Sequence, residues 1–149
     1  MIARKPPHVV RSGGTVTCVT ARRPKVLVVD DISVIRDLIR VNLELEGFEV
    51  VTAHDGLDCL AKVSDVEPAV ITLDVTMPRL GGFETARRLK ANAATRHIPI
   101  LMVTAAAQAT DLRKGEAAGV DGYLTKPFDP AELVDVVTAL AQAQDGVRD

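Results

Sequence analysis

The chain has 149 residues, of which 47% are hydrophobic, and its 18 basic and 20 acidic side chains give a net charge of −2. This length corresponds to about one domain. No apolar run approaches the roughly 18 residues that span a bilayer, and the N-terminus lacks the apolar core of a secretion signal. The two cysteines, Cys18 and Cys59, are too few for a disulfide framework or a zinc site. We therefore expect a soluble, cytoplasmic protein with no membrane partner.

Residues 1–24 differ in composition from the rest of the chain. Six of the 18 basic residues lie in the first 25 positions, which hold no acidic residue. This segment has no aromatic side chain to stack on bases and no amphipathic period for a membrane surface. Its prolines and glycines interrupt any regular element. We expect residues 1–24 to form a disordered basic tail.

From Lys25 onward, short β-branched segments alternate with helical patterns five times, which is typical of an α/β fold with a parallel sheet. The expected strands cover residues 26–29, 48–53, 69–73, 99–103 and 123–125. The expected helices cover residues 33–46, 57–66, 83–91, 109–118 and 130–142. This pattern predicts one domain over residues 25–142, followed by a frayed C-terminus over residues 143–149.

Several residues beside these helices are typical of helix ends. Ser33 and Asp129 are expected to cap the first and last helices, because their side chains can accept hydrogen bonds from free backbone donors. Gly47 and Gly119 each follow a helix and suit the left-handed conformation that often ends one. These signals support the expected helix boundaries.

Polar side chains follow four of the predicted strands at the point where each strand ends. Asp30 and Asp31 follow the first strand and Asp74 the third, while Thr104 and Lys126 follow the fourth and fifth. Because the carboxyl ends of parallel strands meet at one edge of a sheet, these side chains should converge. Each alone has an ordinary interpretation as a helix cap, a threonine bonded to its own backbone, or a solvated lysine. Their coincidence and complementary chemistry favour a shared site.

The converging groups suit phosphoryl transfer. Three carboxylates offer few, hard oxygen ligands, which suits an octahedral magnesium ion, Mg²⁺, that keeps several waters. The cation would relieve the repulsion between the carboxylates and prepare the site for a phosphoryl group. Asp74 is a candidate nucleophile because carboxylates form acyl phosphates. Mg²⁺, Lys126 and Thr104 could each hold one phosphoryl oxygen.

Taken together, these segments resemble the receiver domains of two-component response regulators, the CheY-like family. The resemblance covers residues 25–142 and rests on the motifs Val28-Val29-Asp30-Asp31, Leu73-Asp74 with Met77-Pro78 and Gly82, Val103-Thr104-Ala105, and Gly122-Tyr123-Leu124-Thr125-Lys126-Pro127-Phe128. It implies a doubly wound, flavodoxin-like sheet of five parallel strands in the order 2-1-3-4-5, with five helices.

The resemblance also implies a role for each site residue. Asp74 would accept a phosphoryl group from a sensor histidine kinase or a histidine phosphotransfer protein. Mg²⁺ would be held by three carboxylates and one backbone carbonyl, those of Asp30, Asp31, Asp74 and Thr76. Thr104 and Lys126 would bind the phosphoryl oxygens, and the Lys126-Pro127 bond is expected to be cis. No enzyme activity is implied beyond this self-catalysed transfer and autodephosphorylation.

The family switches when the hydroxyl residue moves toward the phosphoryl group and an aromatic side chain on the last strand rotates inward. Thr104 and Tyr123 occupy these two positions. The alternative for Tyr123 is a half-buried ring whose hydroxyl stays in contact with solvent. The expected readout surface consists of the predicted helices 109–118 and 130–142 and the strand between them. It would bind an unidentified target protein, or a second copy after phosphorylation, and no direct DNA binding is expected.

The first predicted helix is apolar on more than one side. Four residues can face the sheet, namely Ile35, Leu38, Ile39 and Leu43. Three others form a second stripe, namely Val34, Val41 and Leu45. An exposed stripe often marks a partner surface, and sensor kinases dock near this helix in the family. The alternative is that the N-terminal tail covers the stripe, and we favour docking.

A few positions near the site distinguish this chain within the family. Gly81 stands where an acid commonly precedes the glycine that opens the third helix, at a cost of about a few tenths of a kcal/mol because glycine caps nearly as well. Thr76 and Ala106 lie where the family controls the access of water to the phosphoaspartate, and both are small. We therefore expect an accessible phosphoryl group and dephosphorylation that is not unusually slow.

Four other functions were weighed as alternatives, and the last two are disfavoured. A phosphorelay intermediate that passes the phosphoryl group to another histidine would use the same residues, and a phosphorylation-independent binding module would use the same fold. A phosphatase of the haloacid dehalogenase type needs a second aspartate two residues after its nucleophile, where this chain has Thr76. A flavin-binding protein of this fold is disfavoured because no phosphate-binding loop follows the first strand.

Overall fold

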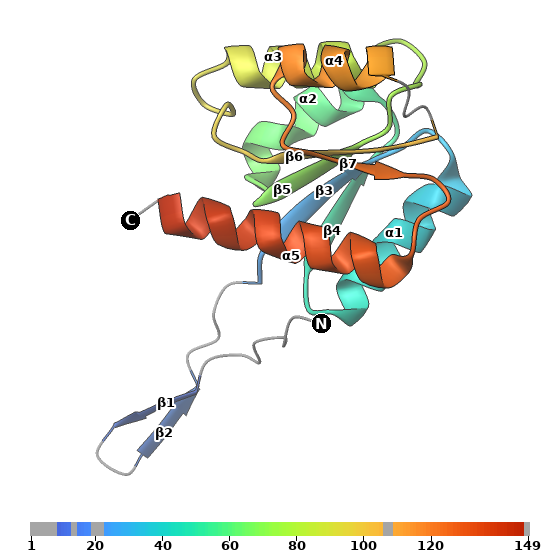
Figure 1. The fold of residues 1–149 in the computed structure, drawn as a ribbon. Coiled ribbons are helices and arrows are strands. Elements are labelled where there is room, and N and C mark those ends of the chain that lie inside the picture. The colour runs from blue at the N-terminus through green and yellow to red at the C-terminus, as the bar shows by residue number, and fades with distance from the viewer. Residues whose placement is uncertain (1–8, 13–14, 19–22, 106–108, 148–149) are drawn as a thin grey trace.

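The computed structural model describes residues 9–12, 15–18, 23–105 and 109–147, with side chains described over residues 23–105 and 112–143. Its main sheet has five strands, β3 (Lys25–Val29), β4 (Glu49–Ala53), β5 (Val70–Leu73), β6 (Ile100–Thr104) and β7 (Gly122–Thr125). The helices are α1 (Ser33–Leu45), α2 (Gly56–Val66), α3 (Gly82–Ala91), α4 (Ala109–Ala118) and α5 (Pro130–Val147). Strands and helices alternate along the chain as the sequence predicted (Figure 1).

The five strands lie side by side in the order β4-β3-β5-β6-β7, and every neighbouring pair is parallel. Counted from β3 as the first, this is the order 2-1-3-4-5, so the expected doubly wound fold is confirmed. The chain moves outward from β3 to β4, crosses to β5, and then continues to β7 at the other edge. The winding direction therefore reverses between β3 and β5, where ligands bind in sheets of this kind.

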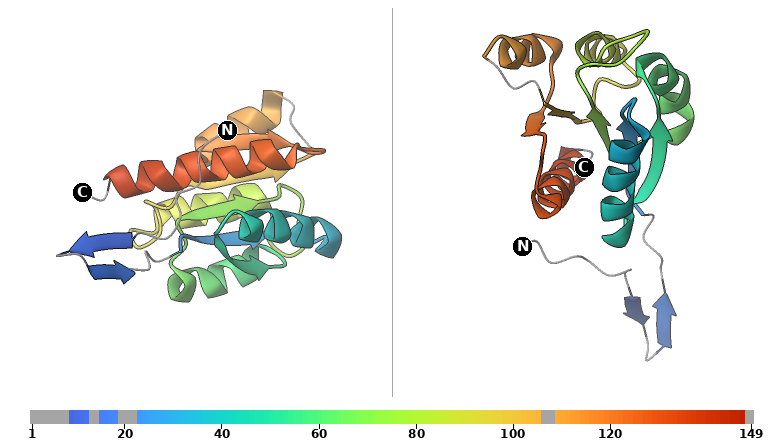
Figure 2. Two further views of the ribbon diagram at one scale, coloured as in Figure 1. Left: turned by 90° about the horizontal axis from the view of Figure 1, so that it is seen from below. Right: turned by 90° about the vertical axis from the view of Figure 1, so that its right-hand side faces the viewer.

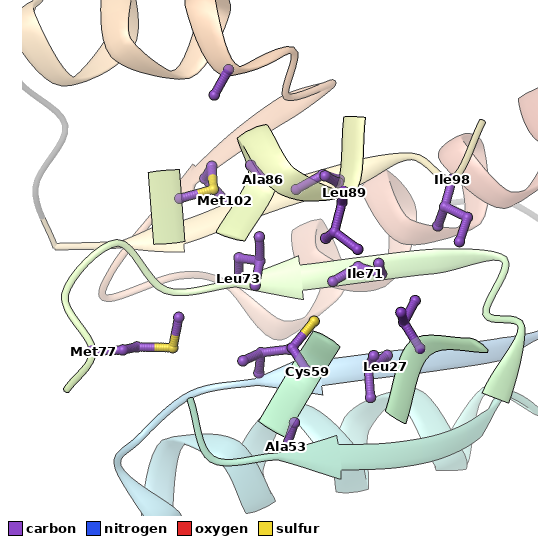
Figure 3. Packing of buried hydrophobic residues seen from close by; sticks show 14 residues of the cluster. Leu27, Ala53, Cys59, Ile71, Leu73, Met77, Ala86, Leu89, Ile98 and Met102 are labelled. Atoms are coloured by element: carbon purple, nitrogen blue, oxygen red, sulfur yellow. The ribbon is translucent and has the colours of Figure 1, made fainter. Parts of the chain in front are cut away.

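Helices cover both faces of the sheet, with α1 and α5 on one side and α2, α3 and α4 on the other (Figures 1 and 2). A separate hydrophobic cluster fills each side, and Figure 3 shows the one beneath α2, α3 and α4, which includes Leu27, Ile71 and Met102. Every residue of β5 and β6 is buried. Strands covered on both faces need apolar side chains at consecutive positions, which explains their continuous hydrophobic runs.

Four of the expected helix ends are confirmed: two C-terminal ends at glycines and the N-terminal ends of α3 and α5. Gly47 and Gly119 have φ angles of 97° and 86°, the left-handed conformation that glycine adopts without a Cβ clash. Asp129 accepts a hydrogen bond from the backbone N–H of Ala131 at 2.9 Å and so caps α5. Gly81 occupies the N-cap of α3 and offers no side-chain acceptor, as predicted.

The expected cap of the first helix is corrected by the structure. Ile32 occupies the N-cap of α1, and Ser33 is already the first helical residue. The backbone N–H of Ile32 donates instead to Asp30 Oδ1 at 2.9 Å. This bond holds the residue before the helix, and no side chain caps the first turn of α1.

The far C-terminus is also more regular than expected. Helix α5 extends to Val147, so the predicted fraying of residues 143–149 is wrong up to that point, and residues 148–149 lie outside the described chain. Alanine and glutamine at 141–144 are good helix formers, which favours continuation of the helix. Among the described residues, no helix, including the extended α5, is long and apolar enough to cross a membrane.

Part of the N-terminal tail forms a β-hairpin. Strands β1 (Val9–Ser12) and β2 (Thr15–Cys18) pair antiparallel, with Ser12 opposite Thr15. The expectation of disorder therefore does not hold for these eight residues. Two β-branched runs around two glycines are a typical hairpin pattern. The same glycines also suit an irregular segment, which is what the sequence analysis predicted. The hairpin is set apart from the main sheet (Figures 1 and 2).

Helix α1 carries the exposed apolar stripe that the sequence suggested, with one more member. Ile39 and Leu43 are buried against the sheet as expected, whereas Leu38 is 44% exposed and does not face the core. It joins three other exposed apolar residues of this helix, and the stripe consists of Val34, Leu38, Val41 and Leu45. These positions follow the spacing i, i+4, i+7 and i+11, so they line one side of the helix.

Candidate functional site

The register of the sheet brings the strand ends that carry the predicted site residues to one edge. Val29 at the end of β3 pairs with Leu73 at the end of β5, and Thr104 pairs with Thr125 of β7. The backbone N–H of Asp74 still donates to the Val29 carbonyl at 3.2 Å, so the pairing continues one residue past the strand. The acidic residues that follow β3 and β5 are consequently neighbours.

Three carboxylates gather at this edge. Asp30, Asp31 and Asp74 each offer an oxygen, and these oxygens all lie within 4.8 Å of one another. Asp30 and Asp74 are 1% and 7% exposed, whereas Asp31 is exposed. The cluster thus combines two carboxylates shielded by the protein with one that faces water, and it can be approached from the solvent side.

Lys126 reaches the same cluster from the end of β7. Its Nζ donates to Asp30 Oδ2 at 2.8 Å and lies 3.5 Å from Asp74 Oδ2. Its backbone N–H donates to the Thr104 carbonyl at 2.9 Å, which fixes the lysine relative to β6. The Lys126-Pro127 bond is cis, as predicted. One ammonium group therefore faces a cluster of three carboxylates, which leaves a surplus of negative charge.

Asp30 is held at three points. Its Oδ1 accepts from Ile32 and its Oδ2 from Lys126, and Arg36 donates from Nη1 to the Asp30 backbone carbonyl at 2.8 Å. The sequence indicates a role for Arg36 only through its position in the first turn of the helix that follows the acidic pair. These contacts fix the orientation of the more deeply buried carboxylate.

The electrostatic setting of Asp74 disfavours its charge. Burial raises the pKa of Asp74, and the nearby charges of Asp30 and Asp31 raise it further. The positive charge of Lys126 and the backbone N–H of Val75 oppose this effect, because both stabilise the ionised form. Any additional cation at the cluster would act in the same direction as the lysine.

The donor set fits Mg²⁺. Carboxylate oxygens are hard ligands, and a magnesium ion typically takes one or a few of them and retains water at its other positions. Asp30, Asp31 and Asp74 supply such oxygens from two adjacent strand ends. Thr76, whose backbone carbonyl is the further expected ligand, is exposed in the segment between β5 and α3. Ala106, the other position expected to control water, lies outside the described residues.

Gly82 packs against the backbone of the candidate phosphoacceptor. A Cβ at Gly82 would lie 2.2 Å from the Asp74 carbonyl oxygen, so only glycine fits where α3 begins. The Gly82 N–H also donates to the Val75 carbonyl at 2.9 Å. The segment that leaves Asp74 is therefore closed back onto itself at the start of α3.

The two predicted switch residues lie on neighbouring strands. Thr104 ends β6 and is 2% exposed, and Tyr123 on β7 pairs with Met102 and is partly buried. A Cβ at Gly115 of α4 would lie 1.5 Å from the Tyr123 hydroxyl oxygen. The tyrosine hydroxyl therefore packs against α4 at a position where a side chain would clash with it. Nothing in the sequence pattern had indicated a role for Gly115.

Comparison with known proteins agrees with this geometry. Residues 26–138 match the response regulator receiver domain family. The chain is 41% identical over 115 residues to the protein PilG of Pseudomonas aeruginosa, a match that covers 77% of this chain and 85% of PilG. Its fold superimposes on the chemotaxis protein CheY4 of Vibrio cholerae with a TM-score of 0.76 and 36% identity, covering 79% of this chain and 98% of CheY4. The chain therefore belongs to the response regulator receiver domain family, whose members act in two-component signalling.

A relative with a longer chain is similar over most of this chain. The DNA-binding dual master transcriptional regulator RpaA of Synechocystis is 40% identical over 124 residues, which cover 83% of this chain and 52% of RpaA. This chain thus spans about half the length of RpaA but most of the length of PilG. The two relatives therefore differ in how much of their own length this chain matches.

Proposed function

We propose that this protein is a phosphorylation switch whose Asp74 accepts a phosphoryl group from the phosphohistidine of a sensor kinase in a reaction that requires Mg²⁺. One observation carries the proposal, namely the unbalanced charge of the site. Three carboxylates lie within 4.8 Å of one another and a single ammonium group, that of Lys126, contacts two of them. Such a site favours the arrival of further positive charge, and then of a phosphoryl group.

The proposed chemistry assigns a step to each residue. Mg²⁺, when bound to the carboxylates, supplies positive charge to the equatorial oxygens of the phosphoryl group. An Asp74 oxygen attacks the phosphorus, and a P–O bond forms while the P–N bond to the donor histidine breaks. The imidazole leaves with the electron pair of that bond and takes up a proton. Lys126 and Thr104 hold phosphoryl oxygens, and later attack by water on phosphorus releases phosphate from Asp74.

The proposed conformational change joins Thr104 to the readout surface. Movement of the Thr104 hydroxyl toward the phosphoryl group would free space near β7, into which Tyr123 could turn. In the structure, the tyrosine hydroxyl lies against Gly115 of α4, so its ring already links β7 to that helix. A rotation of Tyr123 would therefore change the surface formed by α4, β7 and α5.

The proposed docking surface for the kinase is the exposed stripe of α1. Its four members are between 43% and 74% exposed, and they form a continuous apolar line along the helix. A line of this spacing suits packing against a helix of a partner. Helix α1 begins two residues after Asp31, so a kinase helix bound there would lie beside the acidic cluster.

The proposed output is binding of a target protein, or of a second phosphorylated copy, by the surface of α4, β7 and α5. RpaA is named as DNA-binding, but this chain spans only about half of its length. PilG is spanned over 85% of its length. We keep, as part of this proposal, the prediction that the described receiver region does not itself contact DNA. Transfer of the phosphoryl group onward to another histidine would use the same site and is the alternative outcome.

The test is the intact mass of the protein after incubation with acetyl phosphate and Mg²⁺. We expect a phosphoryl adduct on the wild type that is absent from Asp74→Asn and absent when EDTA replaces Mg²⁺. The carboxamide is close in size to the carboxylate but is not a nucleophile of this kind, so the fold should persist. Folded wild-type protein without an adduct, in the presence of Mg²⁺, would refute the proposal and favour a phosphorylation-independent binding module.

A further inference from the structure

A second charged pair joins two of the connections that follow strands at this edge of the sheet. Asp55 comes between β4 and α2, and Arg79 lies in the segment between β5 and α3. Both Nε and Nη2 of Arg79 lie 2.6 Å from Asp55 Oδ2. Asp55 is only 2% exposed, so this ion pair is shielded on the carboxylate side. No local sequence pattern indicates the pairing of these two residues.

Asp55 is fully engaged as an anion. Its Oδ1 accepts from the Asp58 N–H at 2.8 Å and caps α2, while His54 Nδ1 lies 3.3 Å from Oδ2. Burial by itself raises the pKa of Asp55, but the hydrogen bonds from Asp58 and Arg79 outweigh burial and lower the pKa overall. The carboxylate is thus charged at neutral pH. Because Asp55 is the N-cap of α2, its ion pair ties Arg79 to the start of that helix.

Arg79 has an unfavourable backbone conformation. Its φ angle is 67°, in the left-handed region that costs a residue with a Cβ about 1 kcal/mol. Two contacts accompany this conformation: the Leu80 N–H donates to the Pro78 carbonyl at 2.7 Å across Arg79, and the Arg79 side chain pairs with Asp55. The next residue packs closely on α2, because a Cβ at Gly56 would lie 2.7 Å from the Leu80 carbonyl oxygen.

These contacts determine the path of the segment that follows Asp74. The segment is closed at its end by the bond from the Gly82 N–H to the Val75 carbonyl. Between these two residues it is anchored to α2 through Arg79 and Leu80. Thr76, the expected source of a backbone ligand for Mg²⁺, lies within this closed segment, three residues before Arg79.

We propose that the Asp55–Arg79 ion pair positions the 75–81 segment so that the Thr76 backbone carbonyl can bind the metal ion. Asp55 and Arg79 are then positioning residues for the Mg²⁺ site, although neither touches the ion. This inference rests on the proposed function, since it concerns the metal of that same site. Residues that orient metal ligands from outside the ligand set typically contribute 10-fold or more to metal affinity.

The test is the affinity of the full chain for Mg²⁺, measured by isothermal titration calorimetry with MgCl₂. Arg79→Gly removes the ion pair while allowing the φ angle of 67° without strain. Asp55→Asn removes the same charge pair but keeps a good N-cap for α2. We expect each variant to bind Mg²⁺ about 10-fold more weakly than the wild type. The double variant should be no weaker than either single one, because both remove one interaction.

Two controls separate positioning from simple stabilisation. Arg79→Lys retains a charge near Asp55 and should recover part of the affinity, whereas Arg87→Ala, on the exposed face of α3, should leave the affinity unchanged. Unfolding in urea with EDTA measures the stability of each variant without metal. Variants that lose stability but bind Mg²⁺ within 2-fold of the wild type would overturn this inference alone. Failure of the wild type itself to bind Mg²⁺ would overturn both this inference and the proposed function.

Discussion

Two lysine–aspartate clusters lie at opposite edges of the same sheet, and their charges are balanced differently. At the amino edge, Lys90 Nζ donates to the carbonyls of Arg96 and Ile98 at 3.1 and 2.8 Å and to Asp121 Oδ2 at 3.2 Å. Asp121 also accepts the N–H of Ile100 at 2.8 Å. One cation meets one anion here, and protein groups satisfy both. This cluster ties α3 to the starts of β6 and β7.

At the carboxyl edge, the same two residue types form a cluster with too many anions. Lys126 contacts Asp30 and Asp74, and Asp31 adds a third carboxylate within 4.8 Å. Like charges at this distance repel, so the arrangement costs stability unless a cation joins it. The comparison shows that the same residue types form both the structural cluster and the proposed site. The two clusters differ in their charge balance.

The largest difference between the clusters should appear in phosphoryl transfer. Lys126→Met should slow formation of the acetyl phosphate adduct about 100-fold at saturating Mg²⁺, because it removes a charge that stabilises the transferring group. Lys90→Met should leave the rate within about 2-fold, since it acts at the other edge of the sheet. The rates come from the time course of intact mass. Equal loss in both variants would mean that the two clusters are not functionally distinct.

A smaller difference is expected in the response of stability to metal. Lys126→Met leaves the buried Asp30 without its cation and should lower the free energy of unfolding in EDTA by about 2 kcal/mol. Saturating Mg²⁺ should restore much of this loss, because the ion binds only the folded state. Lys90→Met should cost about 1 kcal/mol, with or without Mg²⁺, because its partners are partly exposed. Urea unfolding with and without metal measures both, and equal metal rescue of the two variants would contradict the distinction.

The smallest expected effect has opposite signs at the two edges. In EDTA, Asp74→Asn should raise the free energy of unfolding by about 1 kcal/mol, since it removes one of three mutually repelling carboxylates. Asp121→Asn should lower it by a similar amount, because Lys90 then loses the carboxylate that it contacts at that edge. Thermal unfolding at neutral pH gives both values. A destabilised Asp74→Asn would show that Lys126 already balances the acidic cluster.

The elements that the sequence predicted most accurately are those with strong local signals. The expected boundaries of α4 agree with the structure, and those of β3 and β5 differ from it by one residue at their starts. Gly119 was correctly predicted to follow a helix, because glycine adopts the left-handed conformation of a helix end more readily than other residues. A local signal misled at the start of α1, where Ser33 lies inside the helix and Asp30 bonds the N–H of the N-cap residue Ile32.

The residues that the sequence did not indicate are those whose partners are distant along the chain. Arg79 meets Asp55 across 24 positions, and the Tyr123 hydroxyl meets Gly115 across the turn between α4 and β7. Leu38 was assigned to the core because its spacing permits that face, but the packing of α1 on the sheet exposed it. No periodicity in the chain encodes such pairings, because they depend on how whole elements pack.

The sequence by itself determined the parallel α/β sheet and the set of acidic residues, the lysine and the threonine at its carboxyl edge. It could do so because hydrophobic runs locate the strands, and parallel strands place their ends together. Only the tertiary structure decided the charge balance of the site, the connection of its loop to α2, and the exposure of the α1 stripe. These features arise from distances between side chains that are remote in sequence, and those distances exist only once the layers have packed.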